Sequence, residues 1–115
     1  MTSMDEHQDR QARIAKNQSL FREINERIES LNESLETITH SSEWICECAD
    51  LTCIEKIEMP LDEYERIRQH PDRFPVKRGH EVPDVEKTVE QHDGYLVVEK
   101  VGVAGEVARR YDPRA

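Results

Sequence analysis

Three cysteines lie within eight residues of this 115-residue chain, and their spacing constrains the fold more than any other feature. In an extended segment the side chains of residues i and i+2 share one face, so Cys46 and Cys48 are expected to present their sulfurs together. A turn through residues 49–52 would return Cys53 as a third sulfur, and the Asp50 side chain is suited to accept backbone N–H groups within that turn. The pattern C-x-C-x4-C therefore predicts three converging thiolates.

A closed structural zinc site uses four tetrahedral nitrogen or sulfur ligands, so three cysteines require one more, usually a histidine. We predict His80 for this role, because Gly79 lets the backbone bend there and Glu81 is placed to hydrogen bond to the imidazole. His40, just before the cysteines, is the alternative. The remaining histidines are expected to face solvent or lie in turns: His7, His70 and His92.

Two other interpretations of the cysteines stay open, because this spacing is less diagnostic than paired C-x2-C motifs. The cysteines would then be small buried apolar residues, or Cys53 would form a disulfide with Cys46 or Cys48 and leave one odd thiol. An iron–sulfur cluster normally needs four cysteines. The favoured prediction is one structural zinc ion held by Cys46, Cys48, Cys53 and His80.

Composition agrees with a metal-stabilised domain. Hydrophobic and charged residues each make up 36% of the chain, so a domain of this length buries only a modest core, which bound metal would reinforce. The net charge of −9 argues against a general nucleic-acid or anionic-membrane binder. We find no secretory signal or transmembrane pattern and expect a cytoplasmic protein, whose reducing surroundings favour metal ligands over disulfides.

The N-terminal region predicts a long helix over residues 11–40, after a disordered segment at 1–10. Its apolar residues recur in alternating steps of three and four, with Asn17 in the one polar position of the series, which is a heptad pattern. These positions are Ile14, Phe21, Ile24, Ile28, Leu31, Leu35 and Ile38. The helix is expected to pair with a partner protein or with a second copy in a dimeric coiled coil; packing within the same chain is the alternative. The predicted partner-binding residues are Phe21, Ile24, Ile28, Leu31 and Leu35.

Residues 41–115 predict a small α+β domain. One β-hairpin is expected from 44–48 and 53–59, and a second from 85–89 and 95–100, around a turn at His92-Asp93-Gly94. A short helix is expected between Pro60 and Pro71, and another over 103–111. The predicted fold class is thus α+β, with a long heptad helix followed by a zinc-stapled domain of two hairpins and one or two short helices.

Five of the chain's sixteen Lys and Arg residues gather between positions 66 and 78, where they are expected mostly to form a solvated face. Arg73, Lys77 and Arg78 are candidate anion-binding residues.

Several segments resemble, in the same order, a family of small uncharacterised bacterial proteins common among actinobacteria. They include the helix from Ala15 to Ile28, the sequence Cys46-Glu47-Cys48 with Cys53, and Gly79-His80-Glu81. The resemblance covers nearly the whole chain and implies one folded unit with the three cysteines and His80 as its metal ligands. It implies no activity or substrate. Pro60 departs from the Thr-like helix cap expected there, which leaves the start of that helix open.

No reaction is predicted. The chain lacks the paired histidines of zinc proteases, the signature of zinc deaminases and a glycine-rich phosphate loop. We therefore expect a non-catalytic regulatory or adaptor protein that acts through protein–protein interaction with a structural zinc ion. The alternatives are a nucleic-acid- or transcription-associated factor that uses the basic segment, and a thiol redox switch.

Overall fold

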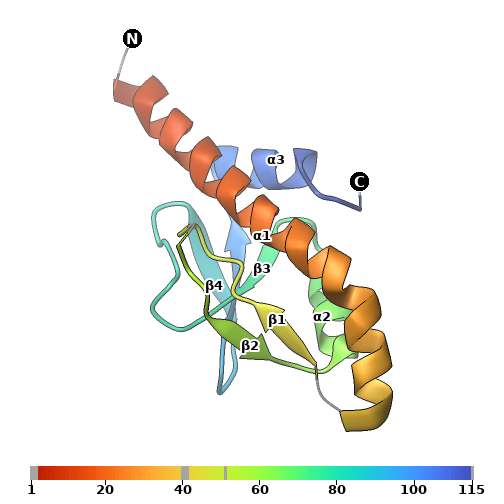
Figure 1. The fold of residues 1–115 in the computed structure, drawn as a ribbon. Coiled ribbons are helices and arrows are strands. Elements are labelled where there is room, and N and C mark those ends of the chain that lie inside the picture. The colour runs from red at the N-terminus through yellow and green to blue at the C-terminus, as the bar shows by residue number, and fades with distance from the viewer. Residues whose placement is uncertain (1–2, 40–41, 51, 115) are drawn as a thin grey trace.

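The computed structural model describes residues 3–39, 42–50 and 52–114. Its elements are, in order, α1 (Ser3–Thr39), β1 (Glu43–Ile45), β2 (Lys56–Glu58), α2 (Leu61–Arg68), β3 (Arg73–Val76), β4 (Glu86–Gln91), β5 (Leu96–Lys100) and α3 (Gly102–Arg110). The long N-terminal helix lies against two small antiparallel sheets and two short helices (Figure 1). The predicted α+β fold class is confirmed.

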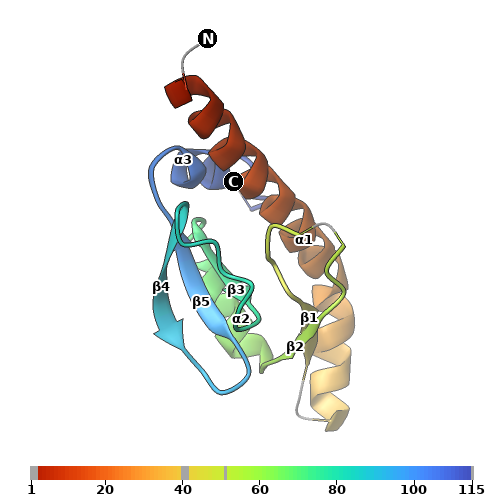
Figure 2. The same ribbon diagram turned by 90° about the vertical axis from the view of Figure 1, so that its left-hand side faces the viewer.

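Helix α1 runs along the whole molecule, and in both ribbon views its N-terminal end projects beyond the other elements (Figures 1 and 2). No Gly or Pro interrupts it, which favours one continuous helix. It begins at Ser3, not near residue 11, so residues 3–10 are helical where the sequence predicts disorder. An ion pair between Arg10 and Asp84 ties this first part to the body. Within the described ranges no helix is both long and apolar enough to cross a membrane.

The strands form two separate sheets. In the first, β1 and β2 pair as the predicted hairpin, with Trp44 opposite Ile57. The second sheet has the order β3-β5-β4, and its β4–β5 pair is the other predicted hairpin. The sequence predicts β3 only as an extended segment, whereas the structure pairs it with β5, with Phe74 opposite Val98. This pairing places the residues after β3 beside the first hairpin.

The short helices begin without a side-chain cap. Pro60 occupies the N-cap position of α2 and makes no capping hydrogen bond, so the helix begins directly after it. Asp62 and Glu63 in its first turn complement the helix dipole instead. Helix α3 lies within the predicted range of 103–111, apart from Gly102 at its start.

The main core lies between the two sheets and α2. Trp44 stacks on Tyr64 with ring centroids 3.9 Å apart, and its indole N–H donates to the Met59 carbonyl at 3.1 Å. Cys46 and Cys48 belong to the same buried cluster. A second, smaller cluster contains Ala15, Val85 and Ala104, whose small side chains let α1 and α3 approach closely. The cysteine segment is thus part of the main core.

Helix α1 turns a polar face toward the body. Its buried polar residues, here called the inner face, are Gln18, Ser19, Arg22, Asn25 and Asn32. The large apolar residues Leu20, Ile24 and Leu31, here called the outer stripe, are 51%, 45% and 60% exposed. An ordinary surface helix buries a mainly apolar side, whereas α1 buries these five polar residues alongside Ala15 and Phe21.

The predicted partner-binding residues of the heptad pattern are consequently divided. Ile24 and Leu31 are exposed, whereas Phe21 is only 8% exposed and is therefore a buried residue of the chain rather than a docking residue. The reason is position, because Phe21 lies toward the inner face, next to buried Arg22. The side chains of Ile28 and Leu35 lie outside the described part of the structure.

Candidate metal centre

Four side chains from two distant segments converge beside the first hairpin. Cys46, Cys48, Cys53 and His80 each offer one ligand atom, and these atoms lie within 4.8 Å of one another. The His80 Nδ1 atom is 3.5 Å from Cys46 Sγ and 3.6 Å from Cys53 Sγ. Three sulfurs and one imidazole nitrogen form a common donor set for tetrahedral metal sites. These residues, here called the cysteine–histidine cluster, are positioned to hold one metal ion, as the sequence predicts.

Backbone hydrogen bonds fix the first two cysteines between the sheets. The Cys46 N–H donates to the Glu55 carbonyl at 2.9 Å, and the Glu47 N–H donates to the Pro75 carbonyl at 3.0 Å. The Lys77 N–H in turn donates to Cys46 Sγ at 3.2 Å. A backbone N–H aimed at a sulfur favours its thiolate form, which is the form that binds metal.

An Asp-stabilised turn returns the third cysteine to the cluster. The Asp50 side chain accepts the Thr52 N–H at 2.9 Å and the Thr52 hydroxyl at 2.7 Å. The Asp50 carbonyl accepts the Cys53 N–H at 3.0 Å, which closes the turn. The predicted role of Asp50 is therefore confirmed.

A glycine turn delivers the histidine. Gly79 has φ of 89°, a left-handed conformation that residues with a Cβ rarely adopt. The His80 N–H donates to the Lys77 carbonyl at 3.0 Å, so residues 77–80 form a tight turn with Gly79 at its third position. This turn directs His80 toward the sulfurs.

Mutual hydrogen bonding polarises the thiols. The hydrogen bond from Cys46 lowers the pKa of the Cys48 thiol to about 5, and the same bond raises the pKa of Cys46. Burial raises the pKa of Cys53. The cluster therefore already favours a thiolate at Cys48, and a bound cation would stabilise the remaining thiolates.

Between two of the candidate ligands, Glu47 points the other way and contacts α1. Its carboxylate accepts hydrogen bonds from Arg22 Nε at 3.0 Å, Asn25 Nδ2 at 2.8 Å and the Tyr64 hydroxyl at 2.8 Å. The side chains of Arg22 and Glu47 are 1% and 0% exposed. Burial raises the pKa of Tyr64, which keeps its hydroxyl a donor. A single three-residue segment, 46–48, thus connects the cysteine–histidine cluster with the inner face of α1.

Arg22 extends this connection beyond Glu47. Its guanidinium donates to the carbonyls of Pro71, at 3.1 Å, and Arg73, and lies 3.8 Å from the centre of the Phe74 ring. All five donors of an arginine need partners when it is buried, and these contacts supply most of them. Helix α1, the cluster segment and the entry to β3 therefore share one buried polar network.

Glu81 does not take the role that the sequence predicts. One of its carboxylate oxygens is shielded from solvent and accepts no hydrogen bond from the described residues. The ring nitrogen of His80 faces Cys46 and Cys53, and no hydrogen bond between the described residues joins Glu81 to this imidazole. The alternative ligand, His40, lies outside the described residues.

The basic segment is largely neutralised by carboxylates. Arg73 Nε is 2.9 Å from Glu99 and Arg66 Nη2 is 2.6 Å from Glu90. Arg68, whose side chain is fully buried, pairs with Glu26 and with the C-terminal Asp112. The five cations of the segment therefore do not form one basic surface. Of the three candidate anion-binding residues, Arg73 is paired, Lys77 contributes its backbone to the cluster and Arg78 donates to the carbonyl of His92.

Sequence reasoning missed the residues that hold the cluster to α1. Arg22, Asn25 and Tyr64 carry no spacing signal relative to Glu47, since they lie on separate elements. One local clue was available, because Arg22 and Asn25 lie three residues apart, each directly after an apolar residue of the heptad pattern. Polar residues at that spacing share one helical face.

Comparisons with protein-family models, with curated proteins and with solved structures gave no significant match for this chain. The resemblance to the actinobacterial family therefore stays a prediction.

Proposed function

We propose that this chain is a non-catalytic regulatory or adaptor protein, in which one structural zinc ion stabilises the domain and α1 docks another protein. The observation that carries the proposal is the cysteine–histidine cluster itself, with four ligand atoms within 4.8 Å. Because Glu47 connects the cluster to α1, a metal bound there would also affect how the helix is held.

The donor set favours zinc. Thiolates are soft ligands and imidazole suits zinc well, while calcium and magnesium prefer oxygen ligands. Four protein ligands would fill a tetrahedral shell and leave no open position for a substrate or an activated water. A structural role follows from that closed shell, and a cytoplasmic, reducing location would keep the thiols available.

The adaptor role rests on the outer stripe. Leu20, Ile24 and Leu31 face away from the body while polar residues hold the helix to it. Exposed apolar residues aligned on a helix are typical of surfaces that dock another protein. Zinc would act indirectly, because it fixes the segment on which α1 is anchored.

The metal part is tested by native mass spectrometry and thermal denaturation of the full chain. We expect one zinc ion per chain. At metal a thousandfold above Kd, binding adds about 4 kcal/mol to the free energy of unfolding, so chelation should lower Tm strongly. His80→Ala should weaken zinc affinity, whereas the matched His70→Ala change at an exposed position should leave it unchanged. A chain that carries no zinc, and whose Tm does not change when a chelator is added, would refute the proposal.

The thiol redox switch stays a prediction. It requires that peroxide releases the metal from the same cluster. Zinc release can be followed with a chromophoric chelator during peroxide addition.

A further inference from the structure

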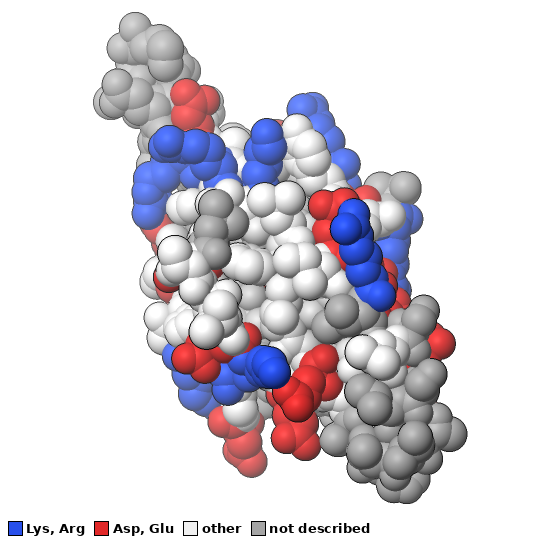
Figure 3. All heavy atoms as spheres, in the orientation of Figure 1, with Lys and Arg blue, Asp and Glu red and all other residues white. Residues whose placement is uncertain are grey.

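The outer stripe is a narrow line along α1. At 100° per residue, Leu20, Ile24 and Leu31 fall within an arc of about 40°. Leu20 and Leu31 lie about three turns, or roughly 16 Å, apart along the helix axis. In Figure 3 uncharged side chains fill the middle of the face that carries α1, and charged ones gather around them. The three exposed apolar residues therefore belong to a helix face whose middle is uncharged.

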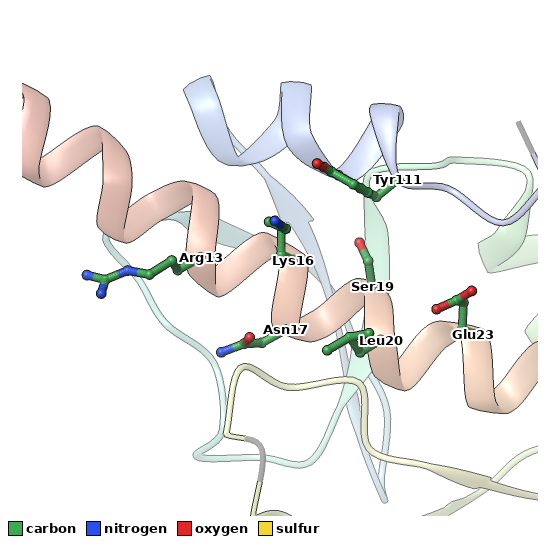
Figure 4. A pocket seen from close by; sticks show the side chains of 7 residues that line it. All are labelled: Arg13, Lys16, Asn17, Ser19, Leu20, Glu23 and Tyr111. Atoms are coloured by element: carbon green, nitrogen blue, oxygen red, sulfur yellow. The ribbon is translucent and has the colours of Figure 1, made fainter.

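A hollow of about 380 Å³ lies beside one end of this line. Leu20 forms part of its wall, together with Lys16, Glu23 and Tyr111, which follows α3 (Figure 4). Its surface is more apolar than polar, and it opens to solvent. The hollow has room for a branched aliphatic side chain.

The other end of the line carries a projecting side chain. Leu31 is 60% exposed, the highest value among the large apolar residues described in α1. When two copies of α1 lie antiparallel, the projecting side chain of each copy can enter the hollow of the other, so the line is self-complementary. A two-fold axis near residues 25–26 then brings Leu31 of each copy to the hollow beside Leu20 of the other, and brings the two Ile24 side chains together near the axis.

We infer that the occupant of the outer stripe is a second copy of this chain, with the two α1 helices antiparallel. The inference rests on the proposed function, because it names the protein that α1 docks. Parallel pairing in register would set Leu31 against Leu31 and hollow against hollow, so neither hollow would be filled.

Charges near the axis favour the same orientation. At 100° per residue, Arg27 and Glu23 lie on the same side of the line, about 40° and 80° from its centre, and both are exposed. In the antiparallel pair, Arg27 of one copy approaches Glu23 of the other, and symmetry repeats this ion pair. In the parallel pair, the two Arg27 side chains would face each other across the seam, where like charges are destabilising.

Sedimentation equilibrium and native mass spectrometry of the full, metal-loaded chain test the inference. The wild type should be a dimer. Leu31→Asp should raise the dimer Kd by about tenfold or more, because it removes an apolar anchor from a pocket. Ile54→Asp is the matched control, since Ile54 is 86% exposed but is not part of the outer stripe, and it should leave the Kd unchanged.

A charge exchange tests the orientation. Glu23→Arg and Arg27→Glu should each weaken the dimer, and the double variant should restore it, because antiparallel pairing then has the same ion pairs reversed. Circular dichroism checks that each variant keeps its helices. A dimer in which the double variant is weaker than both single variants would overturn the antiparallel orientation.

The same spectra separate this inference from the proposed function. A zinc-loaded chain that stays monomeric at high concentration overturns the dimer and leaves an adaptor for a different protein. A zinc-free chain overturns the proposed function whatever its subunit number.

Discussion

The inner face and the outer stripe of α1 differ in the kind of side chain that they offer for contact. The inner face uses buried polar groups, above all the Arg22–Glu47 ion pair with Asn25, and the outer stripe exposes leucine and isoleucine. Apolar contacts tolerate small shifts, whereas charged hydrogen bonds need one geometry. The inner face therefore fixes the position of the helix within the chain, while the outer stripe is the surface that we propose for association.

The largest effect should come from breaking the inner face at its buried ion pair. Arg22→Met leaves the Glu47 carboxylate buried without a counter-ion, so we expect the free energy of unfolding to fall by at least about 3 kcal/mol. Urea denaturation measures this. Arg13→Met makes the same change at an exposed position of α1 and should cost less than about 0.5 kcal/mol.

A double variant sharpens the interpretation. Arg22→Met combined with Glu47→Gln removes both charges, so it should recover part of the loss. If the free energy of unfolding of the double variant fell by the sum of the losses in the two single variants, the ion pair would not be what joins α1 to the cluster segment.

A smaller loss of stability is expected from substitutions at two adjacent residues on opposite faces of α1, and its size should differ between them. Asn32 is buried and its Nδ2 donates to the Glu43 carbonyl at 2.9 Å, while Leu31 is exposed. Asn32→Ala should cost about 1 to 2 kcal/mol, because it leaves that carbonyl without its donor. Leu31→Ala should cost less than about 0.5 kcal/mol in the monomer. Denaturation at low protein concentration keeps association out of the comparison, and equal costs would contradict the assignment of the two faces.

The smallest effect is a pH dependence of stability, which arises where Glu29 of α1 contacts Glu65 and Arg114. Burial and the hydrogen bond to Glu65 raise the pKa of Glu29 from 4.5 to about 7, while the hydrogen bond from Arg114 lowers the pKa of Glu65 to about 2. A raised carboxyl pKa means that the folded state binds the proton more tightly. The stability that Glu29 contributes is therefore full below pH 4.5 and is lost as the pH rises through 7.

Glu29→Gln isolates this contribution. The Tm of the wild type, relative to that of the variant, should fall between about pH 5 and 7, and Glu65 should act in the opposite sense as the pH falls from 4.5 toward 2. Thermal melts of both proteins across this range make the test. Parallel Tm profiles would show that Glu29 does not bind a proton in the folded state at neutral pH.

Local patterns in the sequence determined much of this protein. The cysteine spacing and the turn at Asp50 predicted that the three sulfurs converge, because their geometry depends on short-range backbone conformation. The glycine before His80 favoured that histidine, but its approach to the sulfurs is a tertiary contact between distant segments. The hairpins and helices followed from periodicity and from Gly and Pro. Such signals act over a few residues, which is the range that sequence reasoning covers well.

Only the tertiary structure decided how α1 is used. The heptad pattern showed where apolar residues fall. The contacts that orient the helix join Arg22 to Glu47 and Asn32 to Glu43, and each of them links α1 to a segment that follows it in the sequence. A buried ion pair gains its energy from exclusion of water, which depends on everything packed around it. For that reason Phe21 became a buried residue, while Leu31 of the same pattern remained at the surface.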